Sequence, residues 1–119
     1  MNNTAQQGED IKFTLQGNHE INLDDNNFYV SVYLHNEGCE EPTSLVTLSK
    51  DENFEAILDS EENKTNTYLG RIIAETTANM PTGTYNMELL IITPNNERSI
   101  YKHKHMFTLE CSVSKNISL

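Results

Sequence analysis

Four histidines are the residues of this chain with the clearest capacity for metal chemistry. His103 and His105 flank Lys104, so a strand here would place both imidazoles on one face, because side chains alternate along a strand. Zinc would need further protein ligands from a neighbouring strand. His19 and His35 are the remaining histidines, and nothing in the sequence brings either one close. The pattern therefore favours a solvated strand edge, and we predict no metal ligands.

Two acidic stretches offer oxygen ligands that could hold calcium. These are Asp24-Asp25-Asn26-Asn27 and residues 59–63. Neither has the spaced ligands and the glycine of an EF-hand loop, and Asp and Asn are also ordinary turn formers. We therefore predict turns at both places, and no cofactor.

Catalytic motifs are missing from the sequence. It contains no Gly-x-Ser-x-Gly elbow, and its five glycines are isolated, so no glycine-rich loop could cradle a phosphate. Paired carboxylates are common in a chain this acidic, and none stands out as an acid–base pair. We expect no catalytic residue and a protein that is not an enzyme.

The two cysteines have different surroundings. Cys39 lies in the polar stretch 35–39, whereas Cys111 lies in the alternating run 107–113. A loop cysteine is badly placed for a bridge between core strands. We expect two unpaired thiols, with Cys111 buried as a small apolar side chain.

Length and charge restrict the class of partner. The chain has 119 residues, enough for one domain, and a net charge of −10. This charge disfavours nucleic acid and anionic membranes as partners, because both attract Lys and Arg. Acidic residues crowd the first half, while Arg98, Lys102, Lys104 and Lys115 lie near the end. A solvated acidic face is the simpler interpretation, and head-to-tail packing with copies or with a basic partner is the alternative.

The ends of the chain predict no targeting signal. Residues 1–10 are polar and acidic without an apolar core, so we expect no signal peptide. No run of apolar residues approaches the length of a membrane span. We expect residues 1–9 to form a flexible arm, residues 10–115 one domain and residues 116–119 a tail.

Short alternating runs predict an all-β domain. Apolar and polar residues alternate in stretches spaced about ten residues apart and separated by turn formers. The expected strands cover residues 11–15, 21–23, 28–35, 45–48, 54–58, 68–73, 85–92 and 99–114, the last as one strand or two. One short helical turn is expected near residues 75–80, and residues 59–67 are expected to be a loop. Seven to nine such strands are typical of an immunoglobulin-like antiparallel two-sheet sandwich.

Pro81, Gly83 and Tyr85 form the most informative local motif. A tyrosine that opens a late core strand just after a turn can bond back to the preceding connection, so we expect a structural turn here. Exposed aromatic and basic side chains supply the candidate interaction surface, which consists of Tyr29, Tyr33, Tyr101, Lys102 and Lys104.

Residues 68–89 resemble a segment of immunoglobulin-like modules in tailed-phage virion proteins. There a strand leads to a short helical turn, and a tyrosine opens a long strand, as Glu75 to Tyr85 would do here. Such modules include N-terminal domains of upper baseplate proteins and auxiliary proteins of capsids, collars and tails. The larger proteins continue into coiled coil or fibre.

The resemblance implies a non-catalytic virion subunit that acts by protein–protein docking. Its partners would be capsid, portal or tail proteins and copies of itself, and it would be assembled into the virion in the host cytoplasm. The alternative is a bacterial immunoglobulin-like adhesion or carbohydrate-binding module, for which we would expect an export signal and clustered exposed aromatics. A metal-dependent enzyme is a third reading.

Overall fold

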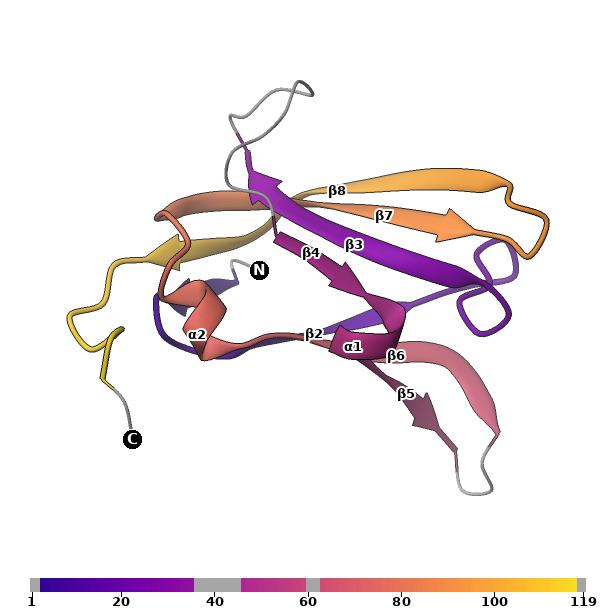
Figure 1. Cartoon of the computed structure of the whole chain (residues 1–119), viewed down its shortest axis with the longest axis horizontal. Coiled ribbons are helices and arrows are strands. Elements are labelled where there is room, and N and C mark those ends of the chain that lie inside the picture. The colour runs from indigo at the N-terminus through magenta and orange to yellow at the C-terminus, as the bar shows by residue number, and fades with distance from the viewer. Residues whose placement is uncertain (1–2, 36–45, 60–62, 118–119) are drawn as a thin grey trace.

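The computed structural model describes residues 3–35, 46–59 and 63–117, which form two facing β-sheets (Figure 1). The five-stranded sheet has the order β1-β8-β7-β3-β4, and the three-stranded sheet has the order β2-β6-β5. The strands are β1 (Thr4–Gln6), β2 (Ile11–Gln16), β3 (Asn27–Leu34), β4 (Val46–Ser49), β5 (Phe54–Leu58), β6 (Lys64–Ile72), β7 (Gly83–Ile92) and β8 (Arg98–Glu110). Two single-turn helices, α1 (Lys50–Asn53) and α2 (Ala74–Thr77), connect strands of different sheets.

Alternation along the strands builds the core between the sheets. In β3, Phe28, Val30 and Val32 are fully buried, while Tyr29 and Ser31 between them are only partly covered. Phe54 and Tyr68 approach Phe28 from the three-stranded sheet, each edge-on, with ring centroids 5.0 and 5.2 Å from that of Phe28. Fully burying a large apolar side chain stabilises the fold by about 1.5–3 kcal/mol. These alternating positions therefore determine which face of each strand is turned toward the core.

The strand order is that of an immunoglobulin domain. β2, β6 and β5 take the positions of strands B, E and D, and β8, β7, β3 and β4 take those of G, F, C and C′. All neighbouring strands are antiparallel except β1, which pairs in parallel with β8. The predicted all-β, immunoglobulin-like sandwich is thereby confirmed.

The expected structural tyrosine is present at the start of β7. Tyr85 is fully buried, and its hydroxyl donates a hydrogen bond to the carbonyl oxygen of Pro81 at 2.6 Å. Its ring stacks on Phe107 of β8, with centroids 5.1 Å apart. Gly83 has φ +142°, a backbone conformation that residues other than glycine rarely adopt. The turn thus ties the helical connection α2 to the central strands.

The N-terminal residues differ from the expected flexible arm. Residues 4–6 form β1, and the segment that follows is bonded to the turn around α2. The buried Gln7 amide donates to the carbonyl of Met80 at 2.7 Å, and the buried Thr77 hydroxyl donates to the carbonyl of Glu9 at 2.7 Å. The prediction of a flexible arm failed because β1 is held by backbone hydrogen bonds to β8. Such pairing needs no alternation of apolar residues, which is the signal that the prediction used.

Other local predictions were also wrong. Residues 21–23 form no strand, β6 begins at Lys64 inside the expected loop, and α1 was not predicted. Cys111 is exposed, because β8 ends at Glu110 and the apolar alternation does not continue in the structure. The prediction for Cys39 lies outside the described residues.

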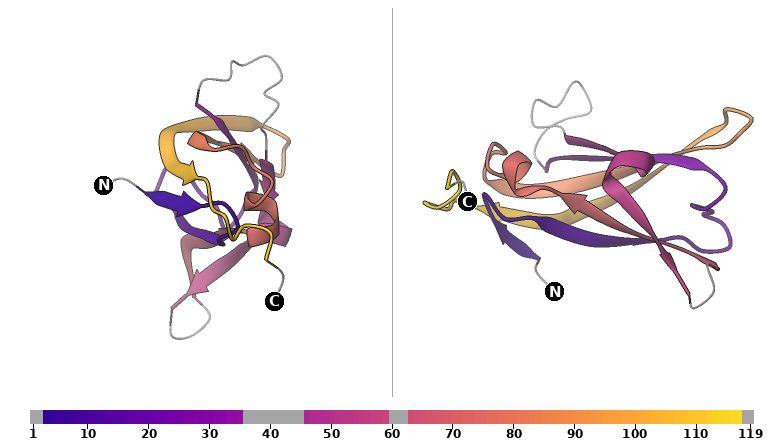
Figure 2. Two further views of the ribbon diagram at one scale, coloured as in Figure 1. Left: turned by 90° about the vertical axis from the view of Figure 1, so that its left-hand side faces the viewer. Right: turned by 60° about the horizontal axis from the view of Figure 1, so that its bottom comes forward.

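The two ends of the sandwich carry different connections. α2 and the C-terminal segment lie at one end, and the turn before β3 and the β7–β8 turn lie at the other (Figures 1 and 2). β3 starts near the second of these ends and runs only part of the way toward the first (Figure 1).

Candidate functional site

The outer face of the five-stranded sheet gathers most of the predicted interaction residues. Directly paired residues on antiparallel strands point to the same side, so Tyr29, Leu90 and Ile100 form one row across β3, β7 and β8. Ile100 is 57% exposed, a large value for an isoleucine in a strand. We call this row, with the charged row beside it described next, the outer face.

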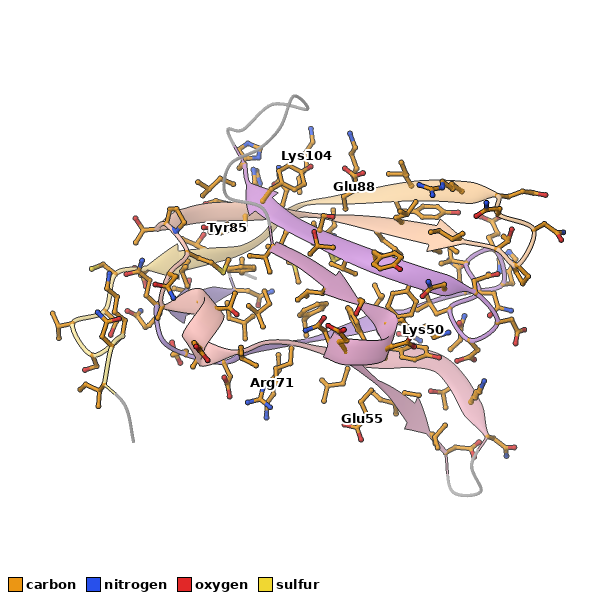
Figure 3. The ribbon with its side chains drawn as sticks, viewed as in Figure 1. Lys50, Glu55, Arg71, Tyr85, Glu88 and Lys104 are labelled. Atoms are coloured by element: carbon orange, nitrogen blue, oxygen red, sulfur yellow. The ribbon has the colours of Figure 1, made fainter. Side chains whose placement is uncertain are left out.

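Charged residues lie beside the apolar row. Ser31, Glu88 and Lys102 pair across the same three strands, two positions further along each strand. Lys104 and Glu88 both extend on this side of the sheet (Figure 3). Tyr33 lies on the same side of β3, opposite Asn86. The outer face therefore joins exposed apolar surface to two lysines and one glutamate.

Tyr101 does not belong to this face. It pairs with Leu89, a core residue, and therefore lies on the side of the five-stranded sheet that faces the other sheet. It is nevertheless 39% exposed. The structure thus brings together Tyr29, Tyr33, Lys102 and Lys104 and separates Tyr101 from them. Leu90 and Ile100 were missed, although alternation along residues 85–92 already indicates that Leu90 points away from the core.

The predicted common face of His103 and His105 is wrong. The pairing of β7 with β8 is irregular between Tyr85 and Met87, and His105 has φ +56° within that irregularity. Extra residues in one strand re-aim the side chains that follow. His103 pairs with Met87 on the inner side, whereas His105 contacts His35, with ring centroids 4.2 Å apart.

The acidic turn before β3 holds an ammonium group of the protein itself. Lys50 Nζ donates to the carbonyl oxygens of Leu23, Asp24 and Asn26 at 2.8, 3.1 and 2.7 Å. It also lies 5.6 and 5.4 Å from the ring centroids of Phe28 and Tyr68. Burial lowers the pKa of Lys50 from its ordinary value of 10.5. The carbonyls that a calcium ion would use are thus already bonded to a lysine.

Asp24 is likewise engaged in hydrogen bonds within the protein. One carboxylate oxygen accepts from the Tyr68 hydroxyl at 3.0 Å, and the other accepts from the Asn66 backbone N–H at 3.0 Å. Burial, followed by the bond to Asp24, raises the pKa of Tyr68 to about 12. Asn66 holds the turn from the other side, since its side-chain oxygen accepts from the Leu23 N–H at 2.6 Å. We call these four side chains, Lys50, Asp24, Asn66 and Tyr68, the Lys50 cluster.

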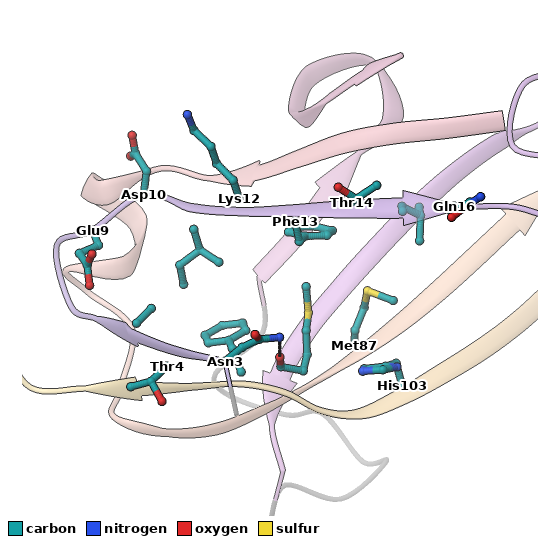
Figure 4. A pocket seen from close by; sticks show the side chains of 15 residues that line it. Asn3, Thr4, Glu9, Asp10, Lys12, Phe13, Thr14, Gln16, Met87 and His103 are labelled. Atoms are coloured by element: carbon teal, nitrogen blue, oxygen red, sulfur yellow. Dashed lines mark hydrogen bonds between the residues drawn. The ribbon is translucent and has the colours of Figure 1, made fainter. Parts of the chain in front are cut away.

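A groove of about 790 Å³ opens between β2 and the β1–β8 pair (Figure 4). Phe13 and Met87 line it from opposite sheets, and His103 lies at its side. Within it, the Asn3 amide donates to the carbonyl of Met106 at 3.4 Å. In the described part of the chain no group of three or more His, Cys, Asp or Glu side chains could hold a metal ion, in this groove or elsewhere.

Comparison with known proteins finds likeness in structure but not in sequence. No family model matches the chain, and no curated protein matches it. One similar structure is a "putative glycoside hydrolase" from Bacteroides vulgatus, at 12% identity and a TM-score of 0.46 over 96% of this chain. The present chain spans 17% of that protein. Another is murine CRIg, at 11% identity and a TM-score of 0.37 over 92% of this chain and 90% of CRIg.

The strand order and the buried tyrosine at the start of β7 define an immunoglobulin-like β-sandwich domain. The described residues include no helix with the length and apolar character of a membrane span.

Proposed function

We propose that this chain is a non-catalytic structural module that docks on a larger protein assembly through its outer face, as a virion subunit of a tailed phage. The observation that carries the docking is the row of Tyr29, Leu90 and Ile100, with Ile100 57% exposed. Exposed apolar residues that adjoin one another are typical of protein-binding surfaces.

The charge of the outer face indicates the chemistry of the partner. Lys102 adjoins the apolar row and pairs with Glu88, and Lys104 extends on the same side of the sheet. The chain as a whole carries a net charge of −10, so this local basic character runs against the composition. Complementary charge raises association rates and selects partners, so the partner surface would be apolar and bordered by carboxylates.

The virion assignment is supported by the resemblance of residues 68–89 to immunoglobulin-like modules of tailed-phage proteins. In this chain that segment forms the end of β6, α2, the Tyr85 turn and the start of β7. Its buried residues, among them Thr77, Met80 and Tyr85, belong to the core, so the segment supports the architecture of the module and assigns no contact residue.

Cosedimentation with phage particles tests both parts of the proposal. Particles of the phage that encodes the chain would be produced without it, and purified protein would then be added back. We expect wild-type protein to sediment with these particles and Ile100→Asp to stay in the supernatant. Val113→Asp is the matched control, because Val113 is a fully exposed apolar residue outside the sheets.

Three results would contradict parts of the proposal. Wild-type protein that never sediments with particles would remove the virion assignment, and binding of the same protein to a glycan array would favour the adhesion or carbohydrate-binding alternative. Equal sedimentation of Ile100→Asp and wild-type protein would place the contact elsewhere on the surface.

A further inference from the structure

The irregular segment of β8 brings two histidines into contact at the end of β3. His105 Nε2 lies 3.2 Å from His35 Nε2, and the ring planes meet at 66°. His105 has φ +56°, in the left-handed region that a non-glycine residue occupies at an energetic cost. Residues held in this way concentrate at binding sites, where the surrounding structure holds the unfavourable conformation. The contact is therefore a product of the strand irregularity.

Asn86 fixes which nitrogen of His35 carries the proton. Asn86 Oδ1 accepts from the backbone N–H of His105 at 2.9 Å, which identifies this atom as the oxygen of the amide. The same oxygen lies 3.2 Å from His35 Nδ1, so Nδ1 must donate to it. A neutral imidazole with its proton on Nδ1 has its lone pair on Nε2. His35 therefore presents a lone pair to His105.

The spacing of the two nitrogens fits a shared metal ion. Zinc–nitrogen bonds of about 2.0–2.1 Å in a tetrahedral site place two ligand nitrogens about 3.3 Å apart. The observed separation is 3.2 Å. His105 is exposed, so rotation of its ring can aim both lone pairs at one point. A histidine whose other nitrogen donates to a buried carbonyl, as His35 does to the 5% exposed Asn86, has the support usual for metal ligands.

We propose that His35 and His105 bind one divalent transition-metal ion, with water in the remaining coordination positions. Imidazole nitrogen selects Zn²⁺, Ni²⁺ and Cu²⁺ over Mg²⁺ and Ca²⁺, which prefer oxygen. No third His, Cys, Asp or Glu of the described residues joins the pair in a group that could hold a metal ion, so the proposal rests on these two imidazoles. The inference does not depend on the proposed docking function, because binding is a property of the isolated chain.

Calorimetric titration of the tag-free protein with ZnCl₂ and with CuCl₂ tests the site. We expect one ion per chain, and a loss of affinity of about tenfold or more in His35→Ala. MgCl₂ is expected to give no binding. The electron paramagnetic resonance spectrum of the Cu²⁺ form should show coordination by two nitrogens, and His35→Ala should reduce this to one.

His105→Gly separates loss of a ligand from loss of the fold. Glycine accepts the positive φ at this position, so this variant should retain its thermal midpoint and yet lose metal affinity as His35→Ala does. His103→Ala and His19→Ala are matched controls, since these two histidines lie on the inner side of β8 and in an exposed turn, and both should bind as wild type does.

Three outcomes would overturn the proposal. The first is the absence of Zn²⁺ and Cu²⁺ binding, which would leave the two rings joined only by an N–H···N hydrogen bond. The second is wild-type affinity in both His35→Ala and His105→Gly. The third is an equal loss in His103→Ala, which would assign the ion to other ligands.

Discussion

β3 begins at one polar cluster and ends at another, and the two are opposite in character. At its start, the Lys50 ammonium donates hydrogen bonds to three backbone carbonyls, and the Asp24 carboxylate accepts two hydrogen bonds. At its end, the half-buried His35 and the exposed His105 face each other through their ring nitrogens. The first cluster is bonded to groups of the same chain, whereas at the second we propose a metal ion taken from outside.

This difference separates stability from binding. Buried polar groups that are fully paired fix one conformation, and removal of one member leaves the others unsatisfied. Groups near the surface that share one hydrogen bond contribute less to the fold, and a ligand can replace that bond. We therefore expect substitutions at the Lys50 cluster to change the free energy of unfolding and substitutions at the histidine pair to change binding.

Lys50→Met should have the largest effect on stability. Methionine keeps the apolar stem but leaves the carbonyls of Leu23, Asp24 and Asn26 without their donor. We expect a loss of about 2–4 kcal/mol in the free energy of unfolding, measured by urea denaturation. Lys12→Met is the control at an exposed lysine and should change it by less than about 0.5 kcal/mol. Equal losses in the two variants would contradict the role given to the cluster.

Strong alkali should weaken the same cluster through Tyr68. Its pKa is raised from 10.0 to about 12, so the folded protein keeps a proton that the unfolded chain has already lost. This contribution to stability is complete below pH 10 and is lost as pH rises toward 12. The lowered pKa of Lys50 has the opposite effect below pH 10.5. There the unfolded chain binds this proton more tightly than the folded protein does, so this contribution to stability rises with pH.

Above pH 10.5 the Lys50 contribution no longer changes, so of these two groups only Tyr68 alters the free energy of unfolding with pH. Between pH 10.5 and 12 we expect its share of the unfolding free energy to fall by about 1.5 kcal/mol, since one unit of pKa is worth about 1.4 kcal/mol and both ends of this range lie close to a pKa of the group. Tyr68→Phe should show a correspondingly shallower decline in urea titrations over this range. If the free energy of unfolding fell equally steeply with pH in the two proteins, the pKa of Tyr68 would not be raised by folding.

Tyr85→Phe should cost less, because a single described hydrogen bond is removed and the ring still packs on Phe107. We expect a loss of about 1 kcal/mol, the usual value for one buried hydrogen bond. Tyr33→Phe is the matched control, as its hydroxyl lies on the outer face of β3, and its unfolding midpoint in urea should stay at the wild-type value. A wild-type midpoint in Tyr85→Phe would count against the structural turn.

The sequence predicted what depends on alternation and missed what depends on contacts far apart in the chain. Phe28 to Leu34 and the Tyr85 turn follow local patterns, so the sandwich and its structural tyrosine could be inferred. The contact of Lys50 with residues 23–26 joins segments that no local pattern relates. His35 and His105 are 70 residues apart and meet through a strand irregularity that shifts the alternation.

His105→Gly should have the smallest effect on stability and gives the sharpest test of the comparison. The substitution removes the ring contact with His35 but also relieves the positive φ, and these two changes oppose each other. We expect the free energy of unfolding to stay within about 0.5 kcal/mol of the wild-type value in urea. A loss as large as that of Lys50→Met would mean that the histidine pair is a structural cluster like the one at the other end of β3. A near-neutral result would leave His105 as a residue that the fold tolerates in an unfavourable conformation, which is the expectation for a ligand and not for a packing element.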